Sequence, residues 1–195
     1  MKILMRAVLG LGATLLAVGL SIGALNAANA DGPGTDPAVV KAIKQQPWVE
    51  IGPDDYDYRT GAMRCYLVQF GYYDNCAANG AWPADFTAAV QKYQKAHNLP
   101  QTGKLDIETW GALQAQGGEV GQGSTKKAQV MGIQYTMKVL QDSSLEVDGQ
   151  YGAGTAKAVK AFQERKEIDA DGIFGPITFR AAFAKGGENK RTPGR

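Results

Sequence analysis

The feature that most constrains this chain is a short motif that it uses more than once. Asp148-Gly149-Gln150-Tyr151-Gly152 returns as Asp171-Gly172-Ile173-Phe174-Gly175, 23 residues later, from 148 to 171. A less regular pair lies upstream at Asn79-Gly80-Ala81-Trp82 and Thr102-Gly103-Lys104-Leu105, again 23 residues apart. The two halves align at an offset of 69, from 79 to 148. Such internal periodicity indicates two copies of one small structural unit.

Between these motifs, apolar residues recur at helical spacing. Met63, Leu67 and Phe70 follow the i, i+4, i+7 pattern of one helix face. The same reasoning predicts further helices at 37–46, 85–96, 107–115, 130–140, 154–166 and 176–184. The expected fold is all-α, with two tandem three-helix bundles. A bundle of roughly 60 residues has a marginal core.

The Asp-Gly and Asn-Gly pairs predict tight turns ahead of the helices. Asp or Asn bonds its own backbone two residues on, and glycine supplies the positive φ. Thr155 and Thr178 are expected to bond the exposed first-turn amides of the helices that follow. Four rings stand at core spacing, and burial is their default role: Trp110, Tyr151, Phe162 and Phe174.

Repeats and composition divide the chain into six expected segments. They are a signal peptide at 1–30, an extension with a short helix at 31–58, a divergent first module at 59–116, a Gly-rich linker at 117–123, a second module at 124–185 and a disordered basic tail at 186–195.

The export signal is inferred from charge and hydropathy. Lys2 and Arg6 precede an apolar run, and Ala28-Asn29-Ala30 has the small-x-small form of a cleavage site. An uncleaved membrane anchor is the alternative, since the run approaches spanning length. Cleavage predicts a periplasmic or secreted protein that does not associate with the membrane.

Cleavage removes two cations and no acid, so the net charge falls from +2 to 0. A neutral chain is a poor candidate for non-specific nucleic-acid binding, and no nucleic-acid partner is expected. The tail after Lys185 is locally basic. We expect it to be a solvated end, with polyanion binding as the alternative.

Cys65 and Cys76 are the only cysteines. In an exported protein, such a pair predicts a disulfide, which stabilises by about 3 kcal/mol in the chain-entropy model. A metal site needs more ligands than the single histidine, His97, supplies, so no metal or other cofactor is expected.

The sequence does not predict an enzyme. It has no His-Glu-x-x-His and no Gly-x-Ser-x-Gly motif. Cys65 and His97 form the only thiol–imidazole combination for a cysteine hydrolase, and a disulfide would leave it without a free thiol. A carboxylate pair for sugar cleavage has no sequence signature and stays open.

The second half closely resembles the type 1 family of peptidoglycan-binding domains. The resemblance rests on Asp148-Gly149-x-Tyr151-Gly152-x-x-Thr155-x-x-Ala158-Val159-x-x-Phe162-Gln163 and on Asp171-Gly172-x-Phe174-Gly175-Pro176-x-Thr178. The first half is similar through Leu67-x-x-Phe70-Gly71-Tyr72, Ala89-Val90-x-x-Tyr93-Gln94 and Gly103-x-Leu105-x-x-x-Thr109-Trp110. It departs from the family at Asn79, Thr102 and Trp82-Pro83. Together the resemblance covers about residues 59–185.

This resemblance implies non-covalent binding of cell-wall peptidoglycan and does not by itself imply catalysis, so the expected protein is a non-catalytic binder. Binding is expected in a shallow groove between the first turn and the second and third helices of each copy. The candidate contacts are Asn79, Trp82, Tyr72, Tyr73, Asp148, Tyr151, Thr155 and Arg180. The rings are expected to stack on sugar and the polar groups to meet the peptide; the alternative roles are turn shaping for the Asp-Gly pairs and a solvated surface charge for the arginine.

A protein-interaction scaffold is the second hypothesis. In that case the partner is a cell-wall hydrolase or another envelope protein, which the chain delivers or restrains. The segment 37–58 lies outside the family pattern, so it is the expected docking region.

Overall fold

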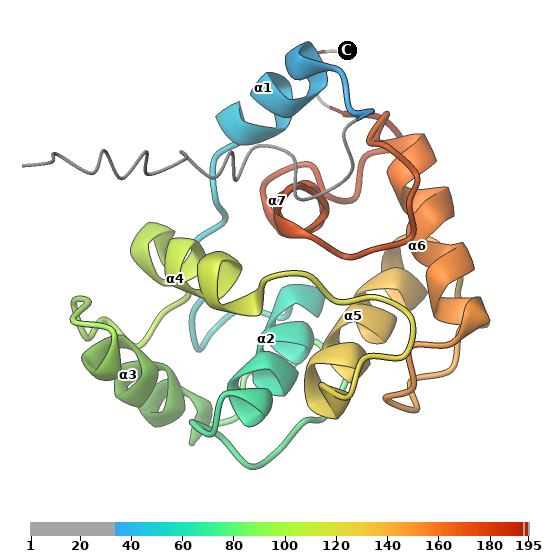
Figure 1. Ribbon diagram of the computed structural model, residues 1–195. Coiled ribbons are helices and arrows are strands. Elements are labelled where there is room, and N and C mark those ends of the chain that lie inside the picture. The colour runs from blue at the N-terminus through green and yellow to red at the C-terminus, as the bar shows by residue number, and fades with distance from the viewer. Residues whose placement is uncertain (1–33, 193, 195) are drawn as a thin grey trace, which may run out of the picture.

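The fold is that of a computed structural model, which describes residues 34–192 and 194. The described residues form seven helices (Figure 1): α1 (Pro37–Gln45), α2 (Tyr58–Gln69), α3 (Phe86–Ala96), α4 (Ile107–Gly117), α5 (Lys127–Leu140), α6 (Ala153–Arg165) and α7 (Pro176–Phe183). The all-α class is confirmed, and every helix predicted from apolar spacing is present. The expected signal peptide lies outside the described residues.

Aspartates begin three of the helices. Asp36 accepts a hydrogen bond from the Ala38 N–H at 2.7 Å, and Asp57 accepts one from the Arg59 N–H at 2.8 Å. Asp106 starts α4 by accepting the Thr109 N–H. Each carboxylate satisfies an amide that has no partner inside its own helix.

A buried glutamine holds the first turn of the second module. The Gly149 N–H donates to Gln134 Oε1 at 2.8 Å. Gln134 Nε2 lies 2.7 Å from Asp148 Oδ1 and 3.1 Å from Thr155 Oγ1. The Thr155 hydroxyl therefore faces Gln134, and it does not cap α6 as the sequence predicted.

Two further turns repeat this arrangement. Gln163 holds the turn at Gly172, and Gln94 holds the turn at Gly103, each through its two amide atoms. The glycines of these three turns have φ between +69° and +78°, as their motif predicts. Gly80 does not adopt a positive φ, so the prediction was wrong for the first turn of the first module.

The first helices of the two copies, α2 and α5, lie against each other (Figure 1). A Cβ on Gly61 would lie 2.7 Å from Tyr135 Cε1, and one on Gly132 would lie 2.8 Å from the carbonyl oxygen of Ala62. Gly61 thus faces Tyr135, and Ala62, one residue later on α2, faces Gly132, which is earlier on α5. The two helices therefore run antiparallel. Two glycines therefore allow a close approach that larger residues would prevent.

The start of each first helix also holds the end of the other copy's third helix. Arg59, on α2, donates to the carbonyl oxygens of Phe183 at 2.8 Å and Ala184 at 3.1 Å. Gln129, on α5, donates to the carbonyl oxygen of Gly117 at 2.9 Å. This reciprocity is the arrangement of a twofold pair, with both copies in one chain.

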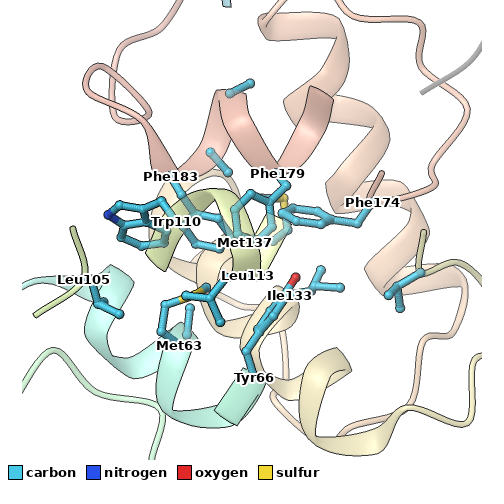
Figure 2. Packing of buried hydrophobic residues seen from close by; sticks show 14 of the residues in the cluster. Met63, Tyr66, Leu105, Trp110, Leu113, Ile133, Met137, Phe174, Phe179 and Phe183 are labelled. Atoms are coloured by element: carbon cyan, nitrogen blue, oxygen red, sulfur yellow. The ribbon is translucent and has the colours of Figure 1, made fainter. Parts of the chain in front are cut away.

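One hydrophobic core serves both copies. Figure 2 shows rings and aliphatic side chains from α2, α4, α5 and α7 meeting in it. Trp110 stacks on Phe183 with ring centroids 5.9 Å apart, and Tyr66 meets Phe179 edge-on at 5.7 Å. The expected order of two three-helix modules is present, but their cores are merged. The merged core buries more apolar surface than the marginal core that each copy would have alone.

The segments that precede α2 and α5 are equivalent parts of the two copies. Ile51 pairs with Leu105 in a backbone bridge, and Val120 pairs with Phe174 in another, at the repeat offset of 69. Ile51 and Val120 are both buried. Val120, which lies in the segment 117–123 read from the sequence as a linker, is thus packed into the second module.

Helix α1 belongs to neither copy. Trp48, just after it, stacks on Trp110 at 5.5 Å and bridges to Ala184. Arg180 donates from Nη2 to the carbonyl oxygen of Gln46 at 2.7 Å, which joins α7 to the end of α1. Among residues 34–192 and 194, no helix combines the length and hydropathy that crossing a bilayer requires.

The C-terminal residues to Thr192 are packed, where the sequence predicted disorder. Glu188 pairs with Arg59 at 2.6 Å. The Lys166 ammonium donates to the carbonyl oxygens of Gly186 and Asn189 at 2.8 and 2.9 Å. The Thr192 hydroxyl donates to the carbonyl oxygen of Lys166. These contacts tie the chain end to α2 and to the end of α6.

Lys166 makes stability depend on pH. Burial, and then the charge of Arg165, lower the pKa of Lys166 from 10.5 to about 8. Between pH 8 and 10.5 the unfolded chain therefore binds the proton that the folded chain has released, so stability rises with pH. From pH 7 to 9.5 the free energy of unfolding should rise by about 1–2 kcal/mol more in the wild type than in Lys166→Met. Urea titrations at both pH values measure this, and equal pH dependence would contradict it.

Candidate functional site

The first pocket lies where α2 ends and α3 begins. Its volume is about 440 Å³, and its lining comprises Gly71, Tyr72, Tyr73, Asp74, Asp85, Ala88, Ala89 and Lys92. Gly71 follows α2 with φ +79°, the left-handed conformation that commonly ends a helix. The Tyr72 N–H then donates to the carbonyl oxygen of Leu67 at 2.9 Å, which fixes the course of the chain beside the pocket.

Two half-buried tyrosines form one side of the first pocket. The Tyr73 hydroxyl donates to Asp85 at 3.0 Å, and its ring lies 5.2 Å from that of Phe86. The Tyr72 ring meets Tyr93 edge-on at 5.1 Å. Burial, and then the hydrogen bond to Asp85, raise the pKa of Tyr73, so its phenol stays neutral. Rings fixed in this way offer an apolar face to a ligand at low entropic cost.

Charges of both signs surround these rings. Asp74, Asp85 and Lys92 line the same pocket and are exposed to solvent. The first pocket therefore combines ring surface with acceptors and a donor for a polar ligand.

The second pocket occupies the equivalent place in the second module. Its volume is about 490 Å³, and its lining comprises Gln134, Asp142, Ser144, Leu145, Glu146, Asp148, Gln150, Gly152, Gly154, Thr155 and Lys157. At the offset of 69, Asp142, Gly154 and Lys157 correspond to Tyr73, Asp85 and Ala88 of the first pocket. The position is shared, but the chemistry differs, because this lining contains no aromatic ring.

The second pocket is predominantly anionic. The hydroxyl and N–H of Ser144 lower the pKa of Asp142. The Gln150 N–H, and then the Gln134 amide, lower the pKa of Asp148. Both carboxylates therefore stay charged well below neutral pH, and Glu146 lies beside them. This lining suits the cationic part of a ligand.

A third cavity lies where the N-terminal segment meets both copies. It has a volume of about 600 Å³, and its lining includes Trp48, Ile107 and Arg180. The Arg180 guanidinium lies 4.2 Å from the centre of the Trp48 ring. Arg180 is thus neither a solvated charge nor part of the second pocket, because it anchors α1 to α7.

The structure places three more of the predicted contacts away from the two pockets. Tyr151 is only 3% exposed, and its hydroxyl donates to the carbonyl oxygen of Gly172, so its ring belongs to the core. Asn79 accepts hydrogen bonds from the Ala81 N–H and from Arg64. Trp82 is half-buried, and its indole N–H donates to Thr87 at 3.0 Å.

The pockets differ from the predicted groove. Each forms between the end of the first helix and the start of the second, and the third helix does not line either. Sequence reasoning named Tyr72, Tyr73, Asp148 and Thr155, which do line them. It considered Lys92, on α3, only as one of several cations that could pair with a peptide carboxylate. It missed Asp74, Asp85, Asp142 and Glu146 of the connecting segments, and Lys157 in the first turns of α6. The available signal was their place at the end of a helix or at the start of the next.

No reactive thiol–imidazole pair forms. Cys65 is bonded to Cys76, which confirms the predicted disulfide. His97 Nδ1 lies 2.9 Å from the carbonyl oxygen of Tyr93, and its ring stacks on the Tyr93 ring at 4.1 Å. Within residues 34–192 and 194, no three His, Cys, Asp or Glu side chains gather in a way that holds a metal ion.

Comparison with known proteins shows that this chain matches a protein family. A family model described as "Putative peptidoglycan binding domain" matches residues 59–113 and again residues 126–182. No curated protein and no solved structure matched the chain. The two matches cover more than half of the chain and coincide with the two sequence repeats. The chain therefore belongs to the peptidoglycan-binding domain family, of which it carries two copies in tandem.

Proposed function

We propose that this protein binds bacterial peptidoglycan non-covalently through its first and second pockets, in the cell envelope after export, and that it does not cleave its ligand. The observation that carries the proposal is the double family match, with a pocket at the same place in each matched copy. The sequence features of an export signal agree with a ligand that lies outside the cytoplasm.

The two linings suit different parts of this polymer. Peptidoglycan presents sugar rings with apolar faces, together with short peptides that carry carboxylate and amino groups. The rings of Tyr72 and Tyr73 suit the sugar, and Lys92 beside them suits a carboxylate. The carboxylates of Asp142 and Glu146 suit an amino group.

The merged core gives the two pockets a fixed relative position. Because α2 and α5 pack directly on each other, the helices beside the two pockets keep a fixed relative position. Two sites on one rigid body bind a repetitive polymer with avidity when the polymer's spacing fits. Each pocket on its own can then bind weakly.

Co-sedimentation with purified insoluble peptidoglycan tests this function. Tyr73→Ala removes a ring from the first pocket and should weaken binding about three- to tenfold, the range expected for loss of one ring contact. Tyr56→Ala is the matched control, because Tyr56 is 81% exposed and lies outside both pockets. It should leave the binding isotherm unchanged.

Two results would count against the proposal. One is a wild-type protein that stays in the supernatant while a protein from the envelope co-purifies with it, which would favour the scaffold hypothesis. The other is release of soluble fragments from the wall by the purified protein, which would show that it is an enzyme.

A further inference from the structure

The first module lacks the glutamine that holds the equivalent turn in the second. At the repeat offset of 69, Cys65 stands where the second module has Gln134. Gln134 is only 2% exposed and bonds the turn through Gly149, Asp148 and Thr155. Cys65 can make none of these bonds, since its sulfur is joined to Cys76.

A second polar contact of the connecting segment in the second module is also missing from the first. Cys76 corresponds to Leu145, whose carbonyl oxygen accepts a hydrogen bond from Lys138 at 2.9 Å in the second module. The counterpart of Lys138 is Gln69, for which the structure shows no such bond to residue 76. One covalent link thus takes the place of two polar anchors of the connecting segment.

This connecting segment carries the first pocket. Residues 71–85 contain no helix, and Tyr72, Tyr73 and Asp74 all lie between α2 and Cys76. In the turn that follows, Asn79 accepts from Arg64 at 3.3 Å, the Arg64 Nε is buried without a hydrogen-bond partner, and the Gly80 carbonyl oxygen accepts from the Asp57 N–H at 3.0 Å. The disulfide adds a covalent cross-link to α2, beside the hydrogen bonds from the Tyr72 and Tyr73 N–H groups to the carbonyl oxygen of Leu67.

We propose that the Cys65–Cys76 disulfide positions the first pocket and that its reduction by a dithiol releases residues 71–82, weakening peptidoglycan binding at this pocket alone. The inference rests on the proposed function. Cys65 is 0% exposed, whereas Cys76 is partly exposed, so Cys76 is the sulfur that a reductant reaches.

Reduction of the Cys65–Cys76 bond proceeds by thiol–disulfide exchange in two steps. A thiolate of the dithiol attacks Cys76 Sγ, and Cys65 leaves as a thiolate. The second thiol of the dithiol, as a thiolate, then attacks the sulfur by which the dithiol is bonded to Cys76, and Cys76 leaves as a thiolate. Two electrons pass to the protein, which gains two thiols, and the dithiol becomes a disulfide.

Hydrogen exchange and co-sedimentation on the full chain test the proposal, with dithiothreitol as reductant and alkylation to count free thiols. Reduction should speed amide exchange in residues 71–82 at least tenfold and leave residues 141–152 unchanged. It should also lower peptidoglycan binding of the wild type at least to the level of oxidised Tyr73→Ala. Reduction of Tyr73→Ala should weaken binding by a smaller factor than reduction of the wild type, because its first pocket has already lost one ring contact.

The variant Cys65→Ser/Cys76→Ser should behave like the reduced wild type and ignore the reductant. Unchanged exchange in residues 71–82 with both thiols free would overturn the proposal. Faster exchange throughout the chain would do so too, because it would show global unfolding. If the oxidised wild type does not bind peptidoglycan, the proposed function fails, while the exchange measurement still decides whether the disulfide holds this segment.

Discussion

Replacing Gly61 by alanine is expected to lower the free energy of unfolding by about 2 kcal/mol or more. The added Cβ would lie 2.3 Å from the carbonyl oxygen of Asn79 and 2.7 Å from Tyr135 Cε1. The first neighbour is backbone and cannot rotate away, so α2 and the segment that holds Asn79 must separate. The second neighbour is a ring of α5, so the added Cβ also crowds the contact between α2 and α5. This loss opposes the gain of about 1 kcal/mol that alanine normally brings to a helix interior.

Gly111→Ala is the matched control for this prediction. Gly111 lies inside α4, is exposed, and has nothing within 4 Å of an added Cβ. Here only helix propensity acts, and stability should rise by up to about 1 kcal/mol. Chemical denaturation of both variants gives the two changes. Stabilisation by both substitutions would contradict the close approach of α2 to Asn79 and to Tyr135 of α5.

Separating the two modules is expected to unfold both. Fragments 34–118 and 119–195 would each expose half of the merged core, including Tyr66 and Trp110 in one and Phe179 and Phe183 in the other. Buried Arg59 would also lose the two carbonyl oxygens it holds in the other module. Each fragment should therefore show no cooperative thermal transition by circular dichroism.

Mixing the two fragments is the control, because together they contain every contact between the modules and lack only the peptide bond between residues 118 and 119. We expect the mixture to recover helical signal that the fragments lack separately. A cooperative melt of either fragment alone, at the temperature of the intact chain, would show that the modules fold independently and that the merged core contributes little.

Local chemistry made the helices and most turns predictable. The Asp-Gly motifs at 148 and 171 predicted glycines with positive φ, which Gly149 and Gly172 have. The 3.6-residue spacing of apolar side chains predicted each helix, since a helix must bury one face. The cysteine pair predicted the disulfide from composition and spacing alone.

The pockets were harder to predict, because they depend on where separate elements meet. Tyr73 was a candidate from the sequence, but its neighbour Asp85 lies across the pocket on the approach to α3. Tyr151 and Arg180 looked available, yet one is in the core and the other holds α1. No local pattern distinguishes a turn residue that faces solvent from one that faces another helix.

The sequence by itself determined the duplicated unit, its three helices and the family to which it belongs, because repeats, periodicity and turn chemistry act over a few residues. Only the tertiary structure decided that the two copies form one body around a shared core. That outcome depends on Gly61 and Gly132 allowing α2 and α5 to touch, and on Arg59 reaching the end of α7. Such contacts join residues far apart in the chain, where the free energy of packing, and no local preference, selects the partner.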